Sequence, residues 1–273
     1  MHRPDTRQYE NTLMTINKFK DNLINFGMFS IPWVAVILIW YLLPITGLIK
    51  ETLVPSPITV FNKFYDLLLN HGLLNDILLS SRRVLIGLAL GVTAATPVAF
   101  LIGWYKPARK IIDPLINFFR ALPPIALIPL VIVYFGIDEL AKTVMLFYAA
   151  FFSSVIVMYE GIVQTNPVFI RVAKTLGATD REIFFRVIMP LSIPHVLTAM
   201  RVALGVCWAT LVAAELVAAE RGLGAVIQNA SNFFQIDVIY VGIICIGVIA
   251  VTMDYLLRIV TTRMVSWQER IST

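Results

Sequence analysis

The chain has 273 residues, of which 58% are hydrophobic and 14% charged, and its mean hydropathy is +0.80. Since about a quarter of the residues in an ordinary soluble domain are charged, this composition excludes that class and predicts an integral membrane protein. The net charge is +5 at pH 7. However, the basic residues are dispersed at the ends of apolar runs rather than gathered on one face, which argues against nucleic acid as a partner.

Six apolar segments of about the length that crosses a bilayer follow one another along the chain. They predict an all-α membrane protein with one transmembrane domain over residues 29–265, between a polar tail at 1–28 and a second tail at 266–273. The predicted spans are residues 29–49, 84–105, 115–136, 141–159, 196–216 and 238–257. Cys207 and Cys245 lie inside spans, and the histidines are scattered, so no disulfide framework or metal site is predicted.

The third predicted span contains three prolines, Pro123, Pro124 and Pro129. Proline interrupts the helical hydrogen bonds, and such a break is tolerated in a membrane only where protein or a water-filled cavity covers the freed backbone groups. This segment is therefore predicted to border a pathway.

A charged, amphipathic segment at residues 166–194 separates the fourth and fifth predicted spans. Asn166 is expected to cap a first helix, and Gly177 to end it. Thr179 begins a capping box that starts a second helix, which is expected to stop at Pro190. A unit of two short helices between two spans is suited to contact with a soluble partner.

The distribution of Lys and Arg predicts the orientation of the spans. Fourteen of the 22 lie in the N-terminal tail, the loop after the second span, the 166–194 segment and the residues after the sixth span, against six in the opposite connections. The positive-inside rule then places both termini and the 166–194 segment in the cytoplasm, and the Gly-rich excursion around Gly222 outside.

The 166–194 segment resembles the cytoplasmic EAA loop of bacterial ABC importer permeases, whose pattern is E-A-A, three residues, Gly, nine residues and Ile-x-Leu-Pro. Arg171, Val172 and Ala173 stand at the E-A-A position, Gly177 at the glycine and Val187–Pro190 at the closing motif. Three further stretches resemble the nitrate, sulfonate and taurine branch of the family: LVPSPITVF, RALPPIALIPLVIVYFGI and WATLVAAELVAAERGLG. The third stretch is most similar to taurine permeases.

The resemblance implies a type I (MetI-like) importer permease in the bacterial inner membrane, bound to two ATPase subunits and a second permease, in a homodimer or a pseudo-symmetric pair. A solute-binding protein would deliver taurine or a related small sulfonate; nitrate, bicarbonate or another small organic solute are alternatives. The chain has no G-x-x-x-x-G-K-[ST] sequence, so ATP and Mg²⁺ are expected in the ATPase partner, with no cofactor and no enzymatic activity here. The residues expected to couple to the ATPase are Arg171, Val172, Ala173, Leu176, Gly177, Ala178 and Pro190.

Charged and polar residues within the predicted spans are candidates for the substrate pathway. They are Arg120, Arg201, Trp208, Thr210 and Glu215. Each has a structural alternative. The two arginines could extend to the surface or pair with a neighbour such as Glu160, and Trp208 and Thr210 could be packed or bonded within the helix. Glu215 could simply be solvated at the membrane rim, whereas its functional interpretation is a contact with the binding protein or an external gate.

Two other classes of protein compete with an importer permease. An intramembrane enzyme would need paired carboxylates, a Ser–His pair or metal ligands at one depth, and the few intramembrane acids, Asp254 among them, form no such set. A stand-alone secondary transporter is expected to show repeated halves, and no clear internal repeat is found.

Overall fold

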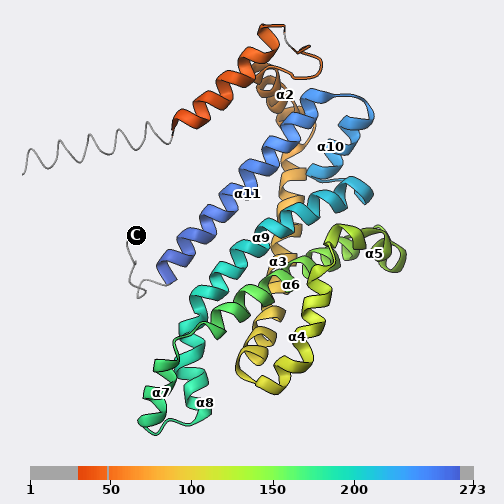
Figure 1. Cartoon of the computed structure of the whole chain (residues 1–273). Helices are drawn as coiled ribbons and strands as arrows, with labels where there is room; N and C mark the ends of the chain where they lie inside the picture. The colour runs from red at the N-terminus through yellow and green to blue at the C-terminus, as the bar shows by residue number, and fades with distance from the viewer. Residues whose placement is uncertain (1–29, 48, 265–273) are drawn as a thin grey trace, which may run out of the picture. The chain divides into compact units, whose positions relative to one another are not determined.

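The computed structural model describes residues 30–47 and 49–264 (Figure 1). Within them the regular secondary structure is entirely helical. The chain divides into two compact units, residues 1–63 and 64–273, and each is described by itself. Both predicted tails, 1–28 and 266–273, lie outside the described residues.

The N-terminal unit contains an apolar helix, Ser30–Ile45, followed by a turn. The Trp40 indole N–H donates to the Pro55 carbonyl at 3.0 Å, which ties this helix to the chain ahead of α2. Helix α2 spans Pro57–Asn70, and the Ser56 hydroxyl accepts from the Thr59 N–H at 3.2 Å. A serine cap followed by proline at the first helical position is a favourable start, because proline lacks the N–H that would go unpaired there.

The second unit contains the remaining helices. They are α3 (Leu73–Trp104), α4 (Lys106–Ala121), the 3₁₀ turn η1 (Pro124–Leu127), α5 (Ile128–Phe135), α6 (Glu139–Val163), α7 (Pro167–Thr175), α8 (Asp180–Ile183), the π-helical turn η2 (Phe184–Ile188), α9 (Met189–Ala218), α10 (Leu223–Asn232) and α11 (Ile236–Met264).

Small residues bring the central helices α3, α6 and α9 together. A Cβ added to Gly87 of α3 would lie 2.2 Å from the Leu146 Cβ, and one added to Gly91 would lie 2.4 Å from the Ala150 Cβ, so the G-x-x-x-G pair packs within the chain. Gly161 of α6 accommodates the His195 ring of α9 in the same way. Small residues are the usual means by which membrane helices approach closely.

The contacts also give the direction of each helix. Gly87 and Gly103 of α3 meet residues 146 and 162 of α6, so α3 and α6 run parallel. Gly161 faces His195, whereas Cys207 of α9 lies beside the Leu146 carbonyl, so α9 runs the opposite way. One end of the unit therefore carries α7 and α8, and is called the α7–α8 end. The other carries the turn between α9 and α10, and is called the α10 end (Figure 1).

Four helices are long and apolar enough to cross a membrane among the described residues: Leu73–Trp104, Glu139–Val163, Asp180–Ala218 and Ile236–Met264. A fifth is formed if α4 and the η1–α5 segment, bent by 83°, count as one broken span. Helix Ser30–Ile45 is shorter, so the predicted count of six is not reached by this measure.

The helices of the second and third predicted spans begin well before those spans. The second helix begins at Leu73 rather than 84, because Arg82 and Arg83 continue the helix instead of ending it. The third was expected from 115, but α4 already begins at Lys106, one residue after α3 ends. Its predicted break is confirmed at Leu122 and Pro123, whose backbones are extended.

The expected stop at Pro190 is wrong. The helical path continues from Asp180 to Ala218 without interruption. Immediately before Pro190 the chain widens into η2, where the Met189 N–H donates to the Phe184 carbonyl five residues earlier. A π turn of this kind changes the hydrogen-bond register ahead of the proline, whose missing N–H is then tolerated as at a helix start.

Candidate functional site

A buried ion pair lies at the α10 end, between α3 and α9. The Arg83 Nη1 donates to the Glu215 Oε1 at 2.6 Å, and their side chains are 6% and 0% exposed. A charge removed from water in this way is tolerated only when it is paired and its remaining hydrogen-bonding groups are satisfied.

The remaining partners of Glu215 fix the turn into α10. Its Oε1 and Oε2 accept from the Ser80 hydroxyl at 2.8 and 3.0 Å, and Oε2 also accepts the Gly224 N–H at 2.8 Å. Arg83 donates to the Arg221 carbonyl at 2.8 Å. Gly222 has φ +124°, and a Cβ there would lie 2.5 Å from the Glu215 Oε1, so the turn requires glycine.

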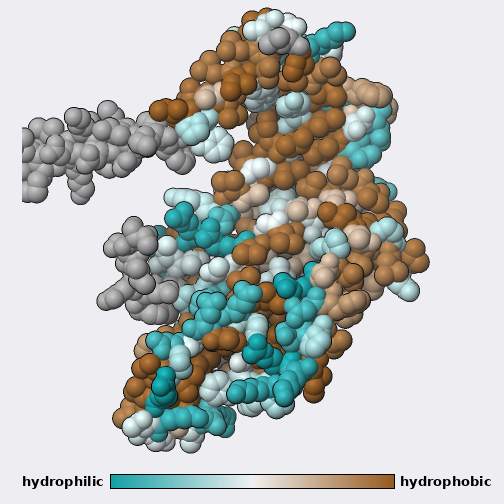
Figure 2. All heavy atoms as spheres, viewed as in Figure 1, coloured by the Kyte–Doolittle hydropathy of each residue, from teal (hydrophilic) through white to brown (hydrophobic). Residues whose placement is uncertain are grey.

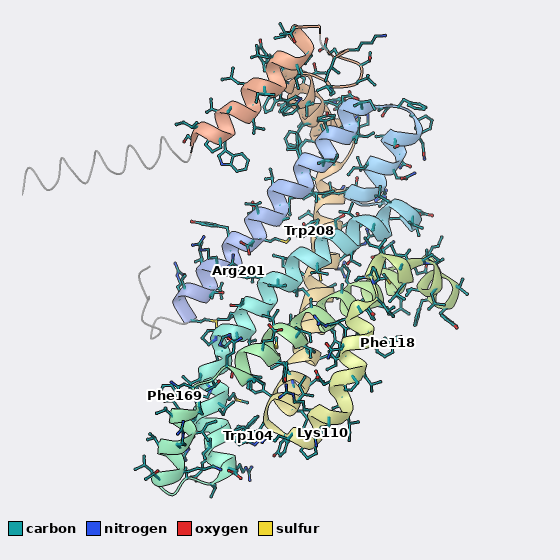
Figure 3. The ribbon with its side chains drawn as sticks, in the orientation of Figure 1. Trp104, Lys110, Phe118, Phe169, Arg201 and Trp208 are labelled. Carbon is teal, nitrogen blue, oxygen red and sulfur yellow. The ribbon has the colours of Figure 1, made fainter. Side chains whose placement is uncertain are left out.

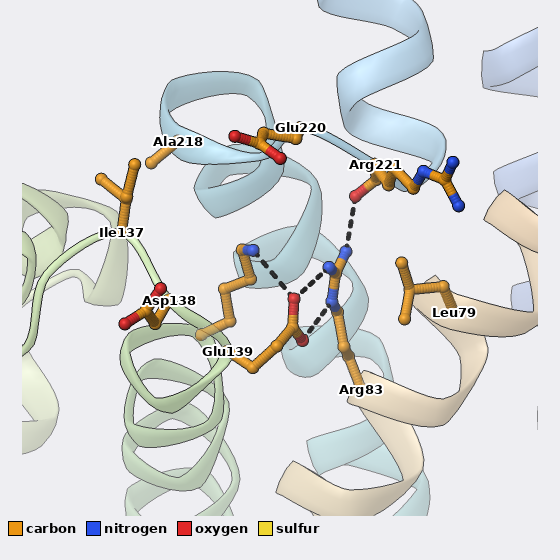
Figure 4. A pocket seen from close by; sticks show the side chains of 9 residues that line it. Leu79, Arg83, Ile137, Asp138, Glu139, Ala218, Glu220 and Arg221 are labelled. Atoms are coloured by element: carbon orange, nitrogen blue, oxygen red, sulfur yellow. Dashed lines mark hydrogen bonds and ion pairs between the residues drawn. The ribbon is translucent and has the colours of Figure 1, made fainter.

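Glu139 joins α6 to the same arginine (Figure 4). It accepts from Arg83 Nε at 2.8 Å and from Nη2, and from the Lys142 ammonium at 3.1 Å. Beside this contact is a pocket of about 280 Å³ whose lining includes Asp138, Glu220 and Arg221. Unlike Glu215, Glu139 is 59% exposed, so this carboxylate forms the accessible side of the cluster.

The structure thus places Glu215 in a buried network, and solvation at a membrane rim is excluded. Arg83 directly precedes the second predicted span and is one of the six basic residues that the sequence places in the opposite connections. No signal in the sequence identifies its partner, because Arg83 precedes the second predicted span and Glu215 lies in the fifth, 132 residues later.

Arg201 of α9 pairs with Asp254 of α11. Arg201 Nε and Nη2 donate to the two carboxylate oxygens, both at 2.8 Å, in the bidentate geometry that suits guanidinium and carboxylate. The pair is partly exposed. Asp254 had been considered only as a possible catalytic acid, but the structure assigns it this helix-to-helix contact.

Trp208 and Thr210 are buried in α9. The Thr210 hydroxyl donates to the Val206 carbonyl at 2.8 Å, the bond within the helix that was given as the structural alternative. The Trp208 indole N–H is buried with no hydrogen-bond partner among the described residues. Figure 3 shows Trp208 and Arg201 on the same helix.

Arg120 lies at the end of α4, directly before the break, and is exposed. Its Nε donates to the Asn117 amide oxygen at 3.0 Å, so the pairing with Glu160 suggested from the sequence is not found. None of the other pathway candidates is brought beside it by the contacts described here. The five candidates therefore do not form a single site.

The α7–α8 hairpin projects from the ends of α6 and α9 (Figure 1). Asn166 caps α7 by accepting the Val168 N–H, Gly177 has φ +81°, and the Thr179–Glu182 capping box is present, all as predicted. Leu176 at the tip is 81% exposed, and Phe169 and Val172 are about half exposed. Arg171, Val172 and Leu176 also line a shallow depression of about 350 Å³.

Comparison with known proteins identifies the family. The family described as "binding-protein-dependent transport system inner membrane component" matches residues 87–266. The chain belongs to this family. A probable ABC transporter permease protein of Brucella abortus is 46% identical over 85% of this permease and 91% of the relative. The taurine transport system permease protein TauC of Escherichia coli is 35% identical over 87% and 89%.

Other relatives are a putative aliphatic sulfonates transport permease of Bacillus subtilis, 30% identical over 86% of this permease and 85% of its own length, and a nitrate import permease of Synechocystis, 26% identical over 81% and 83%. A chain of the methionine transporter MetNI has TM-score 0.56 and 20% identity over 71% of this permease and 94% of that chain, and shows the same fold. The relatives are permease subunits, so the prediction that this chain is not an enzyme is confirmed.

Proposed function

We propose that this permease moves taurine or a related small sulfonate across the bacterial inner membrane, driven by ATP hydrolysis in a separate subunit. The observation that carries the proposal is the similarity to the taurine and aliphatic sulfonate permeases over more than four-fifths of the chain. The nitrate permease relative supports a second candidate, nitrate, an oxyanion that carries a single negative charge as the sulfonate group does but has fewer atoms.

The α7–α8 hairpin is proposed as the contact with the ATPase. Its exposed apolar tip at Leu176 would be unfavourable in water, and its glycine turn presents that tip on two capped helices. ATP-driven closure of two ATPase subunits would then move two hairpins, one from each copy of a permease homodimer, and rock the spans between two open states. We also propose that the full chain crosses the membrane six times, with both termini in the cytoplasm.

The test is reconstitution of the permease with an ATPase subunit and a solute-binding protein in proteoliposomes. We expect ATP-dependent uptake of taurine or alkanesulfonates exceeding that of nitrate and bicarbonate. Leu176→Asp should abolish co-purification with the ATPase, whereas Val163→Asn, at the end of α6 outside the hairpin, should retain it. ATP-independent uptake, or co-purification of Leu176→Asp at the parent level, would refute the proposal.

A further inference from the structure

Helix α4 runs from the α7–α8 end toward the middle of α6. The Arg109 Cζ lies 4.9 Å from the ring centre of Tyr159, near the end of α6, whereas the Tyr148 hydroxyl donates to the Phe119 carbonyl. The steps from Arg109 to Phe119 and from Tyr159 to Tyr148 both cover about 15 Å of helix. Because α6 is itself a membrane-spanning candidate, α4 enters the membrane and does not lie along its surface.

Two different faces of α4 are left uncovered. Ile111, Leu115 and Phe118 form an exposed apolar face, suited to lipid. The opposite face is polar. Its residues recur at steps of four, three, four and three, and all but the half-buried Asp113 are exposed: Lys106, Lys110, Asp113, Asn117 and Arg120. We call this set the polar stripe. In Figure 2 hydrophilic side chains gather over α4, and Figure 3 labels Lys110 and Phe118 on that helix.

The polar stripe cannot face hydrocarbon without cost. Arg120 lies about 20 Å along the helix from Lys106, and an arginine in the middle of a bilayer costs about 3 kcal/mol on insertion scales. The bonds that Arg120 and Asn117 form are within α4: the Asn117 amide donates to the Asp113 carbonyl at 2.9 Å and accepts from the Arg120 Nε at 3.0 Å. A water-filled cavity removes this cost, because it hydrates the exposed guanidinium.

We propose that the polar stripe lines a water-filled vestibule open toward the α7–α8 end, and that Arg120 is its anion-binding residue, contacting the sulfonate group of the cargo. The identity of the cargo rests on the proposed function. The vestibule rests on the direction and faces of α4.

The chemistry of the stripe fits a small anion. Arg120 is exposed and its Nε donates to Asn117, which leaves the two terminal nitrogens of the guanidinium for a ligand. This fork matches two oxygens of a sulfonate as it does those of a carboxylate or phosphate. Lys106 and Lys110 add positive potential at the opening, which raises the local concentration of anions. Asn117 is therefore a positioning residue, acting through Arg120.

The vestibule is tested by thiol labelling of the complete importer in inverted membrane vesicles. Cysteine is placed at Asp113 or Asn117 on the stripe, and at Leu115 or Phe118 on the opposite face as matched controls. The parent chain, whose Cys207 and Cys245 are buried, gives the background. The probe is the membrane-impermeant, anionic 2-sulfonatoethyl methanethiosulfonate, compared with its trimethylammonium counterpart.

We expect the stripe cysteines to react at least tenfold faster than the controls. The anionic-to-cationic rate ratio at Asp113→Cys should fall at least threefold when Arg120→Gln is added. Equal reaction on both faces, or an unreactive stripe sealed against a second copy of the chain, would overturn the vestibule. An unchanged rate ratio would overturn the anion contact.

Uptake then separates this inference from the proposed function. Arg120→Gln and Arg120→Lys should each lower uptake at least tenfold, since lysine keeps the charge but not the fork, while Arg263→Gln, an exposed charge at the end of α11, should not. Asn117→Leu should raise the KM for cargo more than it lowers the maximal rate. If the parent carries nitrate and not taurine, the proposed cargo fails while the labelling pattern still supports the vestibule.

Discussion

Replacing Glu215 by glutamine tests whether the buried pair with Arg83 holds the α10 end together. The amide keeps the shape and one acceptor, but it removes the charge opposite Arg83 and can turn a donor toward the Gly224 N–H that Glu215 now accepts. Breaking a buried pair costs about 3–5 kcal/mol. We expect about 3 kcal/mol for Glu215→Gln, the low end, because Glu139 still faces Arg83.

Glu139→Gln is the matched comparison, since it removes the other carboxylate from the same arginine. Glu139 is 59% exposed, and exposed pairs contribute about 1 kcal/mol or less. The free energy of unfolding would be measured by SDS titration of the purified permease in detergent micelles. A difference of about 2 kcal/mol between the variants corresponds to more than a tenfold change in the unfolding constant.

The reasoning would be refuted if the two variants lost the same free energy. Arg83→Met combined with Glu215→Gln provides a second check, because removing both charges leaves neither one buried alone while the amide keeps an acceptor for Ser80 and Gly224. The double variant should be more stable than Glu215→Gln. Glu220→Gln, an exposed neighbour, should change stability by less than about 0.5 kcal/mol.

Two further stability predictions follow from the helix contacts. Gly87→Ala should destabilise the permease by about 1–3 kcal/mol, since its methyl group would overlap Leu146, whereas Gly205→Ala, with open space around it, should be neutral or slightly stabilising in SDS titration of the monomer. Thr179→Ala should lower the free energy of unfolding by about 1 kcal/mol, because it removes the capping box, and should increase proteolytic cleavage at the α7–α8 hairpin. Thr175→Ala should leave cleavage unchanged. Equal cleavage of the two variants would contradict the role of the cap.

The local chemistry of the α7–α8 hairpin was predictable from sequence. Asn166 and Thr179 accept hydrogen bonds from backbone N–H groups two or three residues further along the chain, and Gly177 adopts a positive φ at a single position. Such local effects depend only on the order of neighbouring residues. Hydropathy likewise placed the long apolar helices, and the paired prolines placed the break in the third span. The continuation of the helix through Pro190 was not predictable in this way, because it depends on a five-residue π turn that shifts the backbone hydrogen bonds before the proline.

Tertiary structure decided which charges meet. Arg83 and Glu215 are 132 residues apart, and Arg201 and Asp254 are 53 apart; nothing in the local sequence specifies these partners. The same holds for α4, whose polar stripe can be recognised from its spacing, but whose depth became clear only from Arg109 on Tyr159 and Tyr148 on Phe119. Sequence alone determined the family, the membrane character and the caps, because these depend on composition and neighbouring residues. The pairing of buried charges depends on how the helices cross, which only the packed structure supplies.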